Sequence, residues 1–159
     1  MRKGDAKGAL GPIEVFLTAD HVRIDQLLRE AERDDGTIDL AVYARFRAEL
    51  LRHIAMEEKV LLPFAKAKRG GVPLELAKPL RDDHGRIARL LVPSPTPALL
   101  QELRALLIAH NPLEEGPDAL YALCDELAGD DPDAVMDKLV AYPPVPVAPH
   151  YDGPLLRRG

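Results

Sequence analysis

His53-Ile54-Ala55-Met56-Glu57 and His110-Asn111-Pro112-Leu113-Glu114 repeat one spacing, a histidine followed four residues later by a glutamate. Residues at positions i and i+4 lie on one face of an α-helix, so each stretch directs an imidazole and a carboxylate to the same side. Two more histidines, His21 and His84, lie in other segments with a helical pattern. Four imidazoles and two carboxylates that converge inside a helical bundle would form a site for two metal ions.

The composition predicts one soluble, helical domain. The chain has 159 residues, of which 47% are hydrophobic and 30% are charged, which is enough for a domain with its own core. Aromatic residues make up 4% and tryptophan is absent. Leucine, valine, isoleucine and alanine must therefore fill the core, which suits packed helices better than sheets. The net charge of −5 argues against nucleic acid as a partner.

The remaining bulk features predict a cytoplasmic protein. Cys124 is the only cysteine, which excludes an internal disulfide framework and fits a reducing compartment. The segment 1–8 is too polar for a secretory signal, and no apolar run approaches the length of a membrane span. We therefore expect no membrane partner.

Start and stop signals predict an up-down bundle of four long helices followed by a short fifth helix. Asp39 is suited to cap the second helix, and the Gly70-Gly71 pair to end it. The expected helices cover approximately 12–34, 39–69, 73–92, 96–128 and 132–142. The bundle is expected over residues 1–142, and the Pro-rich segment 143–159 is expected to be an extended tail.

The apolar pattern predicts that the histidines point inward. Each long helix has apolar residues at spacings of three and four, as Leu17, Ile24 and Leu28 show in the first. In every one of these seams a histidine takes the place of an apolar residue. The four histidines are His21, His53, His84 and His110.

Glu57 and Glu114 share these inward-facing seams. A buried carboxylate costs several kcal/mol unless a cation accompanies it. In helix bundles, inward glutamates and histidines from facing helices are a recurring way to hold two metal ions. A nitrogen and oxygen ligand set without a thiolate suits iron or manganese, and also zinc.

These residues resemble those of the hemerythrin-like, or HHE cation-binding, proteins, whose motif reads H…HxxxE…H…HxxxE across four helices. The resemblance covers approximately residues 13–127. It rests on His21, the stretch 53–63, His84 within Asp82-Asp83-His84, and the stretch 110–115.

The resemblance implies a di-iron centre, oxo- or hydroxo-bridged, at which manganese or zinc could replace iron. Glu57 and Glu114 would bridge the two ions, and the four histidines would be terminal ligands. The family's oxygen carriers have a further histidine four residues after the third-helix ligand, where this chain has Ala88. The open coordination position favours sensing, peroxide or nitric oxide chemistry, or iron handling, over reversible oxygen carriage.

Several function classes stay open at this stage. The favoured one binds or reacts with O2, peroxide or nitric oxide, in sensing or detoxification. An iron-storage or iron-sensing module would bind the same ions without turnover, and a purely structural bundle would bind none. A zinc or manganese hydrolase is less favoured, because no thiol or separate acid–base group is evident. No catalytic residue outside the metal set stands out, and the residues decide neither enzymatic turnover nor the oligomeric state.

The second HxxxE spacing contains Pro112, and Gly116-Pro117 follows it. Proline removes a backbone hydrogen bond, so a kink, a π-like bulge or a restart capped by Asn111 is expected in the fourth helix. The direction of Glu114 is therefore open, and Glu115 is the alternative ligand.

Plainer roles are expected outside this ligand set. Glu58 and Asp83 should face solvent, Tyr43 and Tyr121 should pack in the core, and Cys124 should be a small buried hydrophobe. Asp25 either orients His21, binds metal weakly, or is a solvated helix charge. His150 should be exposed in the tail, the alternative being a tail that folds back over one end of the bundle. These expectations rest on the sequence alone.

Overall fold

A computed structural model describes residues 10–154 of the chain. The described residues form helices and no strand, apart from an isolated backbone bridge between Glu32 and Ile38. The all-α class is therefore confirmed. The polar segment 1–8 and the last residues of the tail lie outside the described residues. None of the described helices combines the length and the apolarity needed to cross a membrane.

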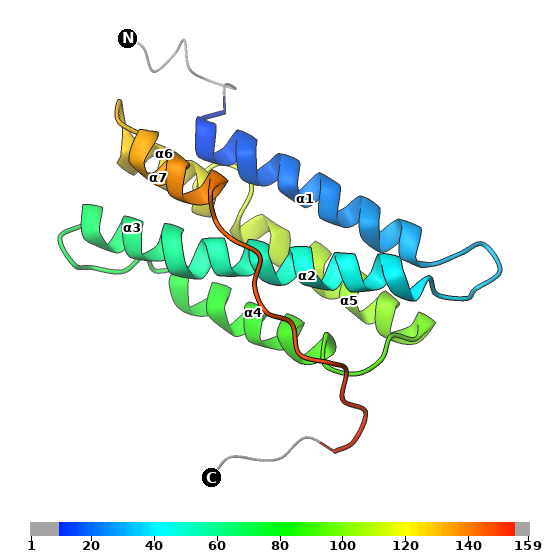
Figure 1. Cartoon of the computed structure of the whole chain (residues 1–159). Coiled ribbons are helices and arrows are strands. Elements are labelled where there is room, and N and C mark those ends of the chain that lie inside the picture. Colours follow the sequence, from blue (N-terminus) through cyan, green and yellow to red (C-terminus); the bar gives the residue numbers. More distant parts are fainter. Residues whose placement is uncertain (1–9, 155–159) are drawn as a thin grey trace.

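The helices follow the expected order, with two departures from regular α-helix (Figure 1). A π-helical turn, η1, joins α2 to α3, and a 3-10 turn, η2, follows α5. The bounds are α1 (Pro12–Ala31), α2 (Leu40–Met56), η1 (Glu57–Leu61), α3 (Leu62–Lys68), α4 (Ala77–Leu90), α5 (Pro97–His110), η2 (Asn111–Leu113), α6 (Leu120–Ala128) and α7 (Asp133–Val140).

Asp39 caps the second helix as predicted, and its carboxylate accepts hydrogen bonds from the amides of Ala41 and Val42. From there α2, η1 and α3 run without a break to Lys68. The π-helical turn between them was not predicted. Pro63 explains it: proline lacks an N–H and its ring would press on the carbonyl of Lys59 in an α-helix. The turn relaxes to i+5 bonding, in which the Leu62 amide donates to the Glu57 carbonyl.

The prediction of one continuous helix over 96–128 is wrong. The α5 helix ends at His110, η2 takes the next three residues, and α6 begins only at Leu120. Pro112 cannot donate within the helix, and Gly116 has a φ of 107°, a left-handed conformation that a glycine adopts at little cost. The predicted kink is therefore a complete break. The third helix also begins later than the predicted start near residue 73, at Ala77.

Two apolar clusters lie at different levels of the molecule. The first joins α1, α2, α4 and α5 through residues such as Leu28, Phe46, Ile87 and Leu103. The second joins α1 and the η1–α3 segment to α6 and α7. Asp125 connects α6 to α1, because its carboxylate accepts hydrogen bonds from the Ile13 and Glu14 amides at the start of α1.

The segment after α7 lies along the bundle, crossing α2 toward the α4–α5 connection in Figure 1. The Tyr151 amide donates to the Val92 carbonyl, and Asp152 accepts from the Ser94 amide and hydroxyl. His150 is half-buried, with its ring stacked 6.0 Å from that of Tyr43. The expectation of an exposed His150 is therefore wrong. The tail packs against the bundle, but His150 belongs to neither group of inward-facing histidines and glutamates.

Candidate metal centre

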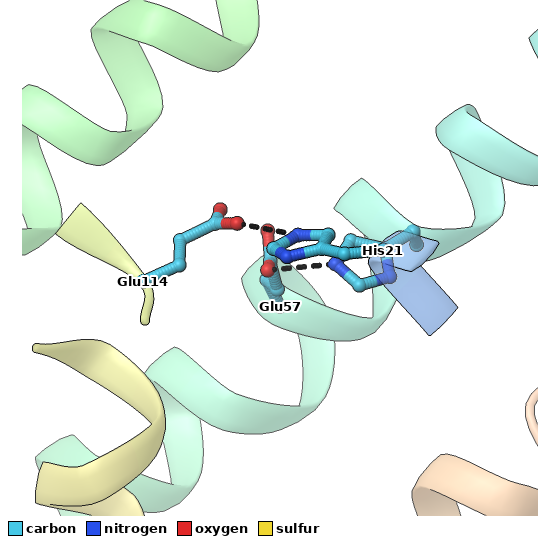
Figure 2. Close-up of side chains that lie close together, drawn as sticks. His21, Glu57 and Glu114 are labelled. Carbon is cyan, nitrogen blue, oxygen red and sulfur yellow. Dashed lines mark hydrogen bonds and ion pairs between the residues drawn. The ribbon is translucent and has the colours of Figure 1, made fainter. Parts of the chain in front are cut away.

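The structure brings together all six side chains that the sequence singled out. Their ligand atoms form two groups, and within each group all of the atoms lie within 4.8 Å of one another. The first group is His21, His53, Glu57 and Glu114, and the second is Glu57, His84, His110 and Glu114. In Figure 2 both carboxylates point toward the region beside the His21 imidazole. The two glutamates belong to both groups, as bridging carboxylates would.

Each glutamate offers one oxygen to each group. Glu114 Oε1 lies 2.9 Å from His21 Nε2, while its Oε2 lies 2.6 Å from His110 Nε2. Glu57 Oε2 lies 3.0 Å from His53 Nε2, while its Oε1 lies 3.0 Å from His84 Nε2. Glu57 is fully buried and Glu114 is 1% exposed. Of Glu114 and its neighbour, the structure places Glu114 in both groups, whereas Glu115 contacts His21 Nδ1.

The outer nitrogen of each histidine contacts a carboxylate from a different segment. His53 Nδ1 lies 2.7 Å from Asp20, His84 Nδ1 lies 2.7 Å from Glu58, and His110 Nδ1 lies 2.9 Å from Asp83. The His21 Nδ1 contact with Glu115 completes the set. We call these four carboxylates the outer carboxylates. They orient each ring so that Nε2 faces inward, an arrangement typical of metal-binding histidines.

The expectation that Glu58 and Asp83 face solvent is therefore wrong, and Asp20 and Glu115 were not considered for this role. A signal was present in the sequence, because every outer carboxylate directly precedes or follows one of the six central residues. Asp25, by contrast, forms an exposed ion pair with Arg29 at 2.7 Å. Of the three roles left open for Asp25, that of a solvated helix charge fits the structure.

Tyr121, expected to pack in the core, reaches the first group with its hydroxyl. The phenol oxygen lies 2.5 Å from Glu57 Oε2 and 3.1 Å from Glu114 Oε1. It also lies 2.9 Å from His53 Nε2 and 3.1 Å from His21 Nε2. The break in the predicted fourth helix makes this possible, since it lets the Tyr121 amide donate to the Glu114 carbonyl. A continuous helix would not form this contact.

The central charges shift the acid–base behaviour of the histidines. Burial by itself lowers the pKa of His53, but the charge of Glu57 and hydrogen bonds to Asp20 and Glu57 raise this pKa to about 10. Burial also lowers the pKa of His84, but hydrogen bonds to Glu114 and Glu57 outweigh this effect and raise the pKa to about 10. Burial favours the neutral acid at Glu114, yet hydrogen bonds from three histidines hold its pKa well below the usual value.

The residues fit a pair of metal ions. Glu57 and Glu114 are buried close together, and each directs its two oxygens to different groups, at 2.6–3.0 Å from histidine Nε2 atoms. Buried carboxylates ordinarily have a cation as partner. The inward donor set is made of imidazole nitrogens and carboxylate oxygens, which suit first-row divalent and trivalent ions. A cation in each group would accompany the two buried carboxylates.

A cavity of about 80 Å³ adjoins both groups. All six central residues line it, and much of the remaining wall is apolar, with Ile24, Leu50, Ile87 and Leu107 among its residues. The space can therefore hold a small molecule beside the six central residues.

Comparison with known protein families decides the relationship. The family model for the Hemerythrin HHE cation binding domain matches residues 13–130, which include every residue of both groups. The chain belongs to the hemerythrin HHE family. Searches of curated proteins and of solved structures gave no match.

In this hemerythrin-family chain, replacing Asp83 by asparagine is expected to weaken metal binding by about 10- to 100-fold. The substitution removes the charge that fixes the His110 ring. The affinity for zinc, measured by competition with a chromophoric chelator, is the readout. Asp82→Asn is the matched control, because Asp82 pairs only with exposed Lys78. Equal affinities for the two variants would contradict a supporting role for Asp83.

Proposed function

We propose that the chain is an up-down four-helix bundle over residues 10–142, with an extended tail from residue 143, and that the bundle holds two iron ions. His21 and His53 would bind one ion, His84 and His110 the other, and the two glutamates would bridge them. The two buried glutamates that belong to both groups are the observation that carries this proposal. Manganese or zinc would occupy the same ligands.

We further propose that the centre binds or reacts with O2, peroxide or nitric oxide, in sensing or detoxification. The size of the cavity and its apolar walls support a small, weakly polar molecule. The bound ions would supply the redox chemistry, since Asp25, which pairs with Arg29, is the one titratable group among the described residues of the cavity wall besides the six central residues. Ala88, one turn after His84, leaves a position beside the second group without a further imidazole.

The protein's own residues have three tasks in this proposal. The outer carboxylates hold the imidazole rings in place and favour a proton on Nδ1, which leaves Nε2 free to bind metal. Leu50, Ile87 and Leu107 keep bulk water away from the reacting side of the centre. The two glutamates offset the charge of the ions. The single cysteine, which is buried, is consistent with the reducing cytoplasm as the site of action.

Anaerobic reconstitution with iron(II) tests the metal proposal. We expect two iron ions per chain by elemental analysis and, after exposure to air, near-ultraviolet absorption from oxidised iron. His84→Ala should lower the iron content to about one ion or less. His150→Ala, which alters a half-buried histidine outside both groups, should leave it at two.

The outcomes separate the alternatives. A colourless protein without iron would contradict the metal centre, and equal losses in the two histidine variants would show that the ligand set is wrong. Two bound ions that leave added peroxide and nitric oxide unchanged would favour an iron-storage or iron-sensing module over a reactive centre.

A further inference from the structure

Tyr121 occupies a position that neither the sequence pattern nor the family description assigns. It lies on α6, outside the paired HxxxE motif, and its side chain is fully buried. Its hydroxyl touches four inward-facing atoms of the first group, one from each of His21, His53, Glu57 and Glu114. Packing alone does not require a phenol oxygen at this point, since phenylalanine would fill the same apolar volume.

The spacing of these atoms matches the ligand positions around a single ion. Nitrogen and oxygen ligands lie about 2.1 Å from a first-row metal ion, so adjacent ligand atoms of an octahedron are about 3 Å apart. The four distances from the Tyr121 oxygen run from 2.5 to 3.1 Å. Among the other atoms of the first group, His21 Nε2 lies 2.9 Å from Glu114 Oε1, and His53 Nε2 lies 3.0 Å from Glu57 Oε2.

Each ligand atom of an octahedral site has four adjacent ligand atoms, and the Tyr121 oxygen has four such neighbours in the first group. The histidines and glutamates of the first group would then form the square base, with the phenol oxygen at one apex. The opposite apex would face the cavity, whose wall contains all four base residues but not Tyr121. Among the described residues, no hydroxyl makes the corresponding contact with His84 or His110 Nε2.

We propose that Tyr121 is a ligand of the ion held by His21 and His53, bound through its phenolate oxygen. As the metal–oxygen bond forms, the phenol O–H bond breaks and its proton passes to solvent; no electron is transferred. A bound cation favours the deprotonated form of a coordinating group, as it does for thiols and water. The two ions are then inequivalent, with five protein ligands on the first and four on the second. This inference rests on the proposed metal centre.

Absorption and resonance Raman spectroscopy of the iron(III)-loaded protein test the proposal. We expect a visible tyrosinate-to-iron charge-transfer band, with tyrosine ring vibrations enhanced on excitation into it. Tyr121→Phe should abolish both signals and weaken the first ion's binding by at least about tenfold. Tyr43→Phe is the matched control: Tyr43 is equally buried, its hydroxyl has no partner among the described residues, and it lies outside both groups. Its spectrum should equal that of the unaltered protein.

A second variant keeps the test decisive if Tyr121→Phe does not fold. The chain has four tyrosines, so the triple variant Tyr43→Phe, Tyr142→Phe, Tyr151→Phe retains Tyr121 alone. It should keep the charge-transfer band at full strength. Two bound irons without a tyrosinate signal in the unaltered protein would overturn the inference and leave the metal centre intact. Absence of bound iron would instead refute the proposed function on which the inference rests.

Discussion

Replacing Glu57 by glutamine is expected to abolish binding of both metal ions. The Glu57 oxygens face different groups, Oε2 toward His53 and Oε1 toward His84. Glutamine preserves the shape of the side chain but replaces one oxygen with an amide NH2, which cannot bind a cation. It also removes a negative charge from a fully buried position. Metal analysis after iron or zinc reconstitution should find much less than one ion per chain.

Glu58→Gln is the matched control for this result. Glu58 is the next residue in the chain, but it contacts only the outer nitrogen of His84. This variant should still bind two ions, but the affinity of the second group, which contains His84, should fall by about 10- to 100-fold. Circular dichroism should show a helical fold in both variants. Retention of two tightly bound ions by Glu57→Gln would rule out a bridging role for this glutamate.

Metal affinity and the stability of the metal-free protein are expected to change with pH in opposite directions. The folded-state pKa values of His53 and His84 are about 10, above the ordinary 6.5. Their contribution to metal-free stability is therefore complete below pH 6.5 and is lost as the pH rises through about 10.

Hydrogen bonds from His53 and Arg23 outweigh burial and lower the Asp20 pKa to about 2. Its contribution is present above pH 3.8 and is lost as the pH falls toward 2.

Metal binding must displace the imidazole protons that stabilise the metal-free protein. In the proposed centre each ion would be held by one histidine with a pKa of about 10 and one whose pKa is raised above 6.5. Its affinity should therefore rise by at least about tenfold per pH unit above pH 6.5 and flatten near pH 10. Zinc titrations by calorimetry in buffers of different ionisation enthalpy would count the protons released, and urea unfolding of the metal-free chain would give its stability. Affinity that does not depend on pH would mean that the imidazoles are neutral before metal binds.

The inward-facing set of six residues could be predicted from the sequence because two simple periodicities coincide. Each histidine replaces an apolar residue in a helical seam, and the HxxxE spacing places the glutamates on the same faces. The cap at Asp39 and the end of the predicted second helix, which the structure places at Lys68 of α3, also followed from local rules. These features depend on residues close together in the chain, where spacing and direction are tightly linked.

The parts that were not predicted depend on contacts between distant segments. Glu58 and Asp83 are polar helix residues beside a ligand, and nothing local shows that their partners are His84 and His110. Tyr121 reaches the site only because the chain breaks between α5 and α6, and Pro112 indicated a disturbance there without its extent. His150 stacks on Tyr43, which lies more than a hundred residues earlier in the sequence.

The outer carboxylates connect the helices in a closed cycle. Asp20 of α1 supports His53 of α2, Glu58 of η1 supports His84 of α4, and Asp83 of α4 supports His110 of α5. Glu115, just after η2, returns to His21 of α1. Turning any one helix about its axis would break the contact it gives and the contact it receives. Local opening of a single helix at this level is therefore disfavoured, and amide hydrogens around the centre should exchange only when the whole bundle opens.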